Sequence, residues 1–560
     1  MVRLQQIKLK IPHTDRQLFQ KVCKLLRVGE TAFTSYRITR RSLDARKKPE
    51  LYYVYTIEAE LKDEPAVRKR MKNKQILFLE KEKPYCAVPT GKHMLPCRPV
   101  VIGTGPAGLF CGYQLARLGY RPILLERGAR VDERMKDVER FWKGGGLKRD
   151  SNVQFGEGGA GTFSDGKLNT LVNDKSGREQ EVLKIFHEFG APEQILYDSR
   201  PHIGTDILCS IVERMRKEII RLGGEVWFHS CAEDFAFTQD QDGTRRLKAV
   251  HVQNTVTGER RRLDTVLAVL AVGHSARDTF QTLYGLGVKM QAKSFAVGVR
   301  MEHPQDFINE SQYGKGYDPA LPAAPYKLTA KAEDGRGVYT FCMCPGGYVV
   351  NASSEEGRLN VNGMSYSERD GRNANSAVIV TVTPEDFGSD GPLSGMEFQR
   401  RLEEAAYQEG GGRIPVQYFA DYCKNQSSSG RQGIDFLTKG ALEGESSIRP
   451  QMKGAYAWAN VRCIFPENLA LDIEQGIRRF DEKIKGYARG DALISGVESR
   501  TSSPLRILRD ETFQSSVKGL YPCGEGAGYA GGITSAAIDG LKVTESIIKV
   551  WCPFDKVGTP

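Results

Sequence analysis

The chain has 560 residues, of which 40% are hydrophobic and 27% charged, as is usual for soluble globular proteins. This length predicts about three domains or lobes. No apolar run approaches the roughly 18 residues that span a bilayer, and the N-terminus lacks the apolar core of a secretory signal. We therefore expect a cytoplasmic protein with no membrane partner. The 12 cysteines form no CxxC pair, so we expect reduced thiols and no metal site.

The net charge of +11 is concentrated at one end of the chain. Residues 1–99 contain 23 Lys and Arg against 10 Asp and Glu, a local net charge of +13. Such an excess is typical either of a solvated surface or of a patch for nucleic acid or another polyanion. These charges lack the aromatic interleaving and the module signature that nucleic-acid binders usually show, which favours the solvated surface.

The first 90 residues are expected to form a separate α+β module. Residues 4–10 alternate like a strand, residues 14–27 carry apolar side chains at helical spacing, and residues 33–41 and 51–61 again resemble strands. We interpret the polar stretch DARKKPE between the last two as a turn. The pattern predicts a βαββ module over residues 1–90, followed by a proline-rich link.

A glycine motif with a clear chemical use lies in residues 99–128, PVVIGTGPAGLFCGYQLARLGYRPILLERG. A buried strand is followed by a turn with Gly103, Gly105 and Gly108, then by a helix and a second strand that ends at Glu126. The first glycine permits the tight turn, the second lets a diphosphate approach the backbone, and the third lets helix and strand pack closely. In this context the GxGxxG spacing predicts a dinucleotide site rather than a turn without a ligand.

The helix that begins at Pro106 and Ala107 would offer free N–H groups and its positive dipole end to the phosphates. Glu126 would accept hydrogen bonds from the adenosine ribose, and we place Arg127 at the same end of the site. The motif by itself does not distinguish NAD from FAD.

A second glycine-rich segment, VQFGEGGAGTFSDGKLNT at residues 153–170, surrounds one acid and one base. Without side chains, such backbone can lie against a flat ring and donate N–H groups to its polar edge. The candidate contacts are Gly158, Gly159, Gly161 and Thr162, with Asp165 and Lys167 as candidate catalytic residues. The alternative is a mobile loop that carries an ordinary surface ion pair.

Residues 205–222 carry one apolar helical face, and the strand-like pieces 225–230, 232–238 and 247–253 predict a small β-meander. The apolar strand that follows ends at Gly273, and we expect Gly273 and His274 to reach the cofactor. For His274, a role as a satisfied loop residue is equally compatible with the sequence.

Residues 289–490 are expected to form an α+β lobe inserted between two parts of the dinucleotide-binding domain. Its candidates for a reacting site are Arg300, which we include among the catalytic residues, together with Cys342, Cys344 and, just beyond the lobe, Arg500. On one strand, Cys342 and Cys344 would point to the same face. They are either a redox pair or ordinary core thiols, and the strain of a disulfide across one residue favours core thiols.

The segment GLYPCGEGAGYAGGITSAAIDGLKVTESI at residues 519–547 resembles the C-terminal signature of FAD-binding proteins of the glutathione-reductase superfamily. The resemblance implies that Gly524, Glu525, Gly532 and Ile533 contact the cofactor and that the following helix points its positive end at the flavin. It also implies that the loop of residues 153–170 lies along the flavin.

Taken together, residues 97–552 resemble a bacterial family of uncharacterised FAD-dependent dehydrogenases, or NAD(P)/FAD-dependent oxidoreductases. The family implies an α/β fold with a Rossmann-like FAD-binding domain, in two parts at residues 97–288 and 491–552, around the inserted lobe. It implies FAD as the cofactor and does not define a substrate.

The favoured hypothesis is an FAD-dependent oxidoreductase that transfers a hydride between flavin N5 and a small-molecule substrate. We expect no dedicated NAD(P)H domain, so NAD(P)H would bind transiently as an electron donor. One alternative is an RNA-binding or partner-binding flavoprotein that docks through the basic module, as in flavin-dependent RNA modification. Another is a protein in which FAD is only a structural ligand.

Overall fold

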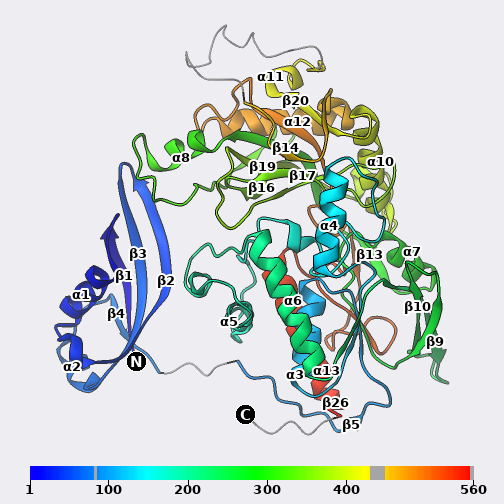
Figure 1. The fold of residues 1–560 in the computed structure, drawn as a ribbon, viewed down its shortest axis with the longest axis horizontal. Helices are drawn as coiled ribbons and strands as arrows, with labels where there is room; N and C mark the ends of the chain where they lie inside the picture. Colours follow the sequence, from blue (N-terminus) through cyan, green and yellow to red (C-terminus); the bar gives the residue numbers. More distant parts are fainter. Residues whose placement is uncertain (81–84, 429–447, 555–560) are drawn as a thin grey trace.

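The computed structural model of the protein describes residues 1–80, 85–428 and 448–554 (Figure 1). An N-terminal module lies beside a larger body, in which a Rossmann-like domain carries an inserted lobe. The predicted α/β class is confirmed. No helix in these described ranges is both long and apolar enough to cross a membrane.

The N-terminal module is a four-stranded antiparallel sheet of order β2-β3-β1-β4 with two helices. Its elements are β1 (Val2–Lys10), α1 (Asp15–Leu26), β2 (Phe33–Lys47), β3 (Glu50–Leu61), α2 (Glu64–Arg70) and β4 (Ile76–Phe78). Thr14 and Gln17 form a capping box that starts α1. The prediction omitted α2 and β4, so the module is the split βαββαβ arrangement rather than βαββ.

The β2–β3 hairpin is longer than predicted and reaches the body (Figure 1). Its strands continue to Lys47 and from Glu50, so the expected seven-residue turn is in fact a tight one. The Arg41 side chain bonds Asp198 at 2.6 Å, and Arg41 N–H donates to the Tyr197 carbonyl at 2.7 Å. The hairpin therefore braces the body at a segment far along the chain.

Five parallel strands, in the order β25-β12-β6-β7-β8, form the sheet of the Rossmann-like domain. They are β6 (Val100–Ile102), β7 (Ile123–Leu125), β8 (Glu225–Trp227), β12 (Ala268–Leu270) and β25 (Leu520–Pro522). All are short, and the three inner strands together with the edge strand β25 are fully buried, as expected for a parallel sheet covered on both faces.

Helices α3, α5, α6 and α13 cover one face of this sheet, and a meander together with α7 covers the other. The helices of the domain are α3 (Pro106–Arg117), α4 (Val131–Trp142), α5 (Arg178–Glu188), α6 (Thr205–Arg221), α7 (Arg277–Gly285) and α13 (Ile533–Val550). The meander consists of β9 (Ser230–Gln239), β10 (Arg245–Asn254) and β11 (Arg260–Asp264). The meander prediction was wrong in part: residues 225–227 belong to the parallel sheet, and β11 was not predicted.

The helices α3 and α13, more than 400 residues apart, pack directly on one another (Figure 1). At Gly540 in α13, a Cβ atom would lie only 2.4 Å from the Ala107 carbonyl oxygen of α3. This close approach places the N-terminal ends of both helices at the same edge of the sheet.

The inserted lobe is built on a seven-stranded sheet of order β15-β16-β19-β14-β23-β20-β22. Its strands are β14 (Phe295–Pro304), β15 (Thr329–Lys331), β16 (Gly337–Cys344), β19 (Asn373–Val382), β20 (Ile414–Tyr418), β22 (Tyr456–Trp458) and β23 (Leu493–Glu498). Because β23 completes this sheet, the lobe continues past the predicted boundary at residue 490.

The other elements of the lobe are helices on the sheet and a small second sheet of order β18-β17-β21. They are α8 (Gln305–Tyr313), α9 (Pro384–Phe387), α10 (Ser394–Glu409), α11 (Phe419–Tyr422), α12 (Glu467–Phe480), β17 (Tyr348–Asn351), β18 (Val361–Met364) and β21 (Met452–Lys453). Two short strand pairs join chain segments outside the main sheets. They are β13 (Met290–Ala292) with β24 (Leu505–Ile507) and β5 (His93–Met94) with β26 (Trp551–Cys552).

Candidate functional site

One cavity is lined both by the glycine motif of the Rossmann-like domain and by residues of the inserted lobe. It is formed by loops at the carboxyl ends of the parallel strands, where α/β sheets bind their ligands. The predicted residues on its wall are Gly103, Gly105, Pro106, Ala107, Glu126, Arg127, Gly159, Gly161, Lys167, Gly273, His274, Glu525, Gly532 and Ile533.

The glycines of the GxGxxG motif have the separate uses that the sequence predicts. Gly103 has a φ of +100°, and a Cβ there would lie 2.3 Å from the Ala271 carbonyl oxygen. A Cβ on Gly108 would lie 1.9 Å from the Gly103 carbonyl oxygen, so this glycine is needed for helix packing and does not line the cavity. A Cβ on Gly105 would meet only the Cα of Gly159, at 3.7 Å. The cavity wall at Gly105 is therefore bare backbone at a helix N-terminus, as a diphosphate requires.

Glu126 lies on the wall but already has a full set of internal partners. One carboxylate oxygen accepts hydrogen bonds from N–H and Oγ1 of Thr104, at 3.1 and 2.6 Å. The other accepts from the N–H groups of Gly128 and Gly156, at 3.0 and 3.1 Å. Glu126 thus ties three loops together at the site, and its bond to a ribose stays a prediction.

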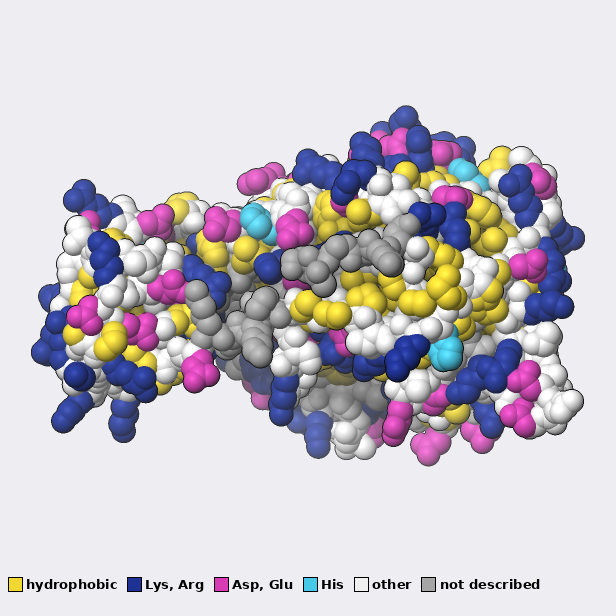
Figure 2. All heavy atoms as spheres, turned by 90° about the horizontal axis from the view of Figure 1, so that it is seen from below, with side chains coloured by type: hydrophobic (Ala, Val, Ile, Leu, Met, Phe, Trp, Pro, Cys, Tyr) yellow, Lys and Arg dark blue, Asp and Glu magenta, His cyan; other side chains and the backbone are white. Residues whose placement is uncertain are grey.

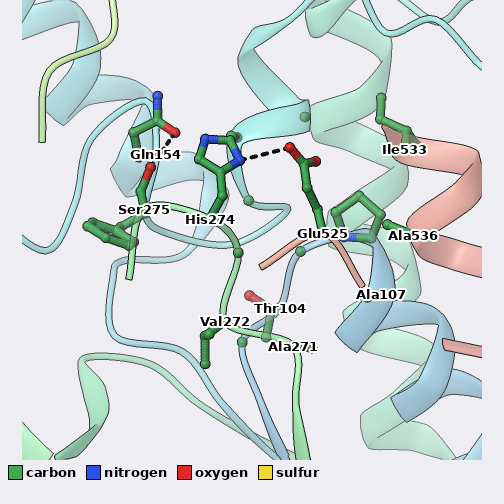
Figure 3. Close-up of a pocket in the computed structure, with 18 of the residues that line it drawn as sticks. Thr104, Ala107, Gln154, Ala271, Val272, His274, Ser275, Glu525, Ile533 and Ala536 are labelled. Carbon is green, nitrogen blue, oxygen red and sulfur yellow. Dashed lines mark hydrogen bonds and ion pairs between the residues drawn. The ribbon is translucent and has the colours of Figure 1, made fainter. Parts of the chain in front are cut away.

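His274 and Glu525 face one another across the cavity edge (Figure 3). His274 Nδ1 lies 2.8 Å from Glu525 Oε1, which joins the loop after β12 to the loop after β25. His274 Nε2 is buried and has no hydrogen-bond partner among the described residues. A buried ring nitrogen without a partner on a cavity wall fits a polar atom of a bound ligand.

Lys167 marks the lobe end of the cavity. Its ammonium lies 2.6 Å from the Asp165 carboxylate and also contacts the Met343 carbonyl oxygen of β16. Burial opposes the charge, but Asp165 holds the pKa of Lys167 above its usual value, so Lys167 is a cation at neutral pH. The loop is anchored by backbone bonds from Leu168 to Pro201 and from Ile203 to Gly166, both 2.9 Å long.

Comparison with known proteins identifies the family. Residues 294–501 match a family described as "FAD-dependent protein, C-terminal domain-like", and residues 101–156 match an NAD(P)-binding Rossmann-like domain. Residues 1–60 match a domain of unknown function. An uncharacterized protein of Clostridium beijerinckii is 46% identical over 553 residues, which cover 98% of each chain.

The chain belongs to this family of FAD-dependent proteins. Its cofactor is FAD, and the bare wall at Gly105, the helix N-terminus and the unpartnered His274 nitrogen fit that cofactor. The predicted family and cofactor are confirmed.

Solved structures of flavoproteins are similar only at a low level. Quinol fumarate reductase FrdA of E. coli is 11% identical, with a TM-score of 0.34 over 81% of this chain and 70% of that chain. A geranylgeranyl bacteriochlorophyll reductase-like protein of Thermoplasma acidophilum is 12% identical, with a TM-score of 0.34 over 80% of this chain and 77% of that chain.

Several residues predicted for this FAD-dependent protein do not reach the cavity. Gly158, Thr162, Gly524, Asp165 and Arg300 are all absent from its wall. The Thr162 side chain fills the space beside Gly158, where a Cβ would lie 2.1 Å from Thr162 Oγ1. Gly524 N–H donates to Asp539 at 2.8 Å, so this glycine holds the loop to α13.

The two charged residues among them, Asp165 and Arg300, are buried beneath the residues that line the cavity. Asp165 is fully buried and binds Lys167 and Arg369. Arg300 is fully buried on β14, where it bonds Glu498 at 2.8 Å and Asn362 at 3.2 Å. Asn362 and Glu498 do line the cavity. Asp165 and Arg300 therefore contact residues of the wall instead of lining the cavity, and their catalytic roles stay predictions.

Arg500 does line the cavity, as part of a buried ion network between the two domains. Glu403 of α10 accepts from Arg500 at 2.8 and 2.9 Å and from Arg277 at 2.8 and 2.9 Å. Arg500 also donates to Ser275 in the loop after β12, at 3.0 Å. Burial opposes ionisation of Glu403, but the two arginines hold its pKa far below the usual value.

Sequence reasoning missed the wall residues Gln154, Phe155, Ser275 and Thr279. Gln154 and Ser275 are hydrogen-bonded to one another at 3.0 Å (Figure 3). Phe155 supports Arg127, whose guanidinium lies 4.5 Å from the ring centroid. Gln154 and Phe155 fall inside the quoted glycine segment, and their position directly before its first glycine was the available signal.

Proposed function

We propose that the protein is an oxidoreductase that transfers a hydride between FAD and a small-molecule substrate held under the inserted lobe. The observation that carries this proposal is the composition of the cavity. One wall is the dinucleotide motif, and the opposite wall comes from lobe strands through Phe341, Cys342 and Asn362. A substrate enclosed between these walls would be positioned against the cofactor and shielded from water.

Bound FAD supplies an acceptor for a hydride at its N5 atom. Lys167 is a cation on the cavity wall that contacts β16 of the lobe, and a positive charge beside a flavin raises its electron affinity. Asp165 and the Met343 carbonyl oxygen hold the ammonium in place. Asp165 is therefore the positioning residue for Lys167.

The test is an anaerobic titration of the purified holoprotein with NADH and with NADPH, followed by the flavin absorbance. We expect bleaching by at least one nicotinamide, which would act as a transient donor. Lys167→Met should slow flavin reduction roughly tenfold to hundredfold, while Lys184→Met, an exposed lysine on α5, should not. A flavin that neither nicotinamide nor any tested metabolite reduces would favour a structural cofactor instead.

Docking of RNA or another polyanion on the N-terminal module remains a prediction. Figure 2 shows Lys and Arg side chains spread over this module and over the body alike. On the open face of the module's sheet, Arg3 and Arg37 are both paired with Glu58, at 2.6 Å. This pairing reduces the charge available to a polyanion, so we rank this function second.

A further inference from the structure

Two cysteines of β16 converge at the lobe end of the FAD cavity. Residues two apart on a regular strand have Cα atoms about 6.5 Å apart, near the upper limit for a disulfide. Here the pairing of β16 with β19 shifts register between Phe341 and Cys344, and Cys342 has a φ of +41°. This bulge bends the strand, and the Cys344 Sγ lies 3.2 Å from the Cys342 carbonyl oxygen. The geometric objection to a bond between these thiols is thereby reduced.

The two thiols differ in exposure. Cys342 lies on the cavity wall and is partly exposed, whereas Cys344 is fully buried behind it. Arg300 donates to the Cys342 carbonyl oxygen at 2.9 Å, and its guanidinium lies 3.7 Å from the Cys344 Sγ. Lys167, on the adjacent loop, contacts the intervening Met343 carbonyl oxygen. The pair thus lies between two cations, with one thiol toward the ligand.

This environment separates Cys342 from the buried cysteines elsewhere in the chain. A hydrogen bond from the Cys344 thiol lowers the pKa of Cys342 despite burial, and Lys167 and Arg300 add to the effect. For Cys111 and Cys209, by contrast, burial raises the thiol pKa, to about 12 and about 11. A thiolate at neutral pH is the reactive form of cysteine.

We propose that Cys342 and Cys344 form a redox pair that exchanges an electron pair with FAD. On oxidation, a bond forms between the two Sγ atoms, the proton of Cys344 is released to flavin N5, and the electron pair passes to the flavin. In the reverse direction the disulfide opens and both electrons return to sulfur. This inference rests on the proposed oxidoreductase function and adds a second electron store to the same site.

The experiment is an anaerobic titration of the holoprotein with dithionite after oxidation by diamide and removal of the reagent. We expect the wild type to take up two electron pairs, the first to open the disulfide and the second to bleach the flavin. After the first pair, the Cys342 thiolate beside oxidised flavin should give a long-wavelength absorption band.

The variants Cys342→Ser and Cys344→Ser should take up one electron pair, and Cys342→Ser should also lose the band. Cys209→Ser is the matched control, because Cys209 is also a buried free cysteine but lies on α6, outside the cavity wall. This variant should behave as the wild type. Mass spectrometry of the oxidised protein should find Cys342 and Cys344 in one disulfide-linked peptide.

The proposal is overturned if the oxidised wild type takes up only one electron pair and retains both thiols free. The wild-type titration decides this even if a variant does not fold. Failure of the proposed function gives a different result, because dithionite reduces the flavin whether or not a nicotinamide does.

Discussion

Replacing Glu403 by Gln tests whether the buried ion network holds the inserted lobe to the FAD-binding domain. Both carboxylate oxygens accept bonds from arginines, and one also accepts from Ser499 Oγ at 2.7 Å. A glutamine keeps one acceptor oxygen, but its amide would direct N–H groups at arginine N–H groups. Arg500, which is buried, would then lose the carboxylate to which it is bonded, and buried Arg277 would keep only its pair with Glu355 at 3.0 Å. Breaking a buried pair in this way costs about 3 to 5 kcal/mol.

The assay is urea unfolding of the holoprotein, with the free energy of unfolding compared between Glu403→Gln and Glu404→Gln. Glu404 is the adjacent residue on α10, but its side chain is 45% exposed and pairs with Arg358 at the surface. Loss of such a pair costs about 0 to 1 kcal/mol. The reasoning is refuted if the two variants are destabilised to within about 1 kcal/mol of one another.

Two further changes test other parts of the structure. Gly159→Ala should weaken FAD binding at least about tenfold, since Gly159 has a φ of +64° and a Cβ there would lie 2.9 Å from the Gly105 Cα. The affinity for FAD is measured by flavin fluorescence. The control Gly146→Ala, at a glycine with open space around it, should leave this affinity unchanged. Burial raises the pKa of Glu302 to about 7, so the folded state holds a proton that the unfolded state has lost, and stability should fall as the pH rises from about 4.5 to 7. Glu302→Gln should remove this pH dependence and be more stable than the wild type by roughly 3 kcal/mol above pH 7. The control Glu310→Gln, at an exposed residue, should keep the wild-type dependence of the unfolding free energy on pH. If Glu302→Gln keeps it as well, Glu302 is not a buried neutral carboxyl.

The sequence predicted the features of the site that depend on local backbone. The roles of Gly103, Gly105 and Gly108 could be predicted because the GxGxxG spacing lies between a strand and a helix. Features that depend on distant contacts were not visible. The spacing of Asp165 and Lys167 could not show which of the two charges reaches the cavity, because that depends on Met343 and Arg369 from the lobe.

The same limit applies to the lobe. Nothing in the sequence distinguishes Arg300 from Arg500, yet Arg300 is enclosed in a sheet and Arg500 lies on the cavity wall. The core-thiol interpretation of Cys342 and Cys344 stays a prediction. It rested on the strain of a disulfide across one residue, and the bulge at this place cannot be recognised from the alternating pattern of the segment. In the N-terminal module, α2 is only seven residues long, too short for a clear helical period.

The brace between Arg41 and Asp198 has a practical consequence for work on fragments. The segment that receives this hairpin continues directly into Pro201 and Ile203, which hold the loop of Lys167 by backbone hydrogen bonds. Deleting the first eighty or so residues would therefore remove a contact that holds the segment of residues 198–203, to which the Lys167 loop is hydrogen-bonded. We therefore expect a truncated protein to have an altered cavity, so that cofactor or activity measurements made on it would not describe the site of the full chain.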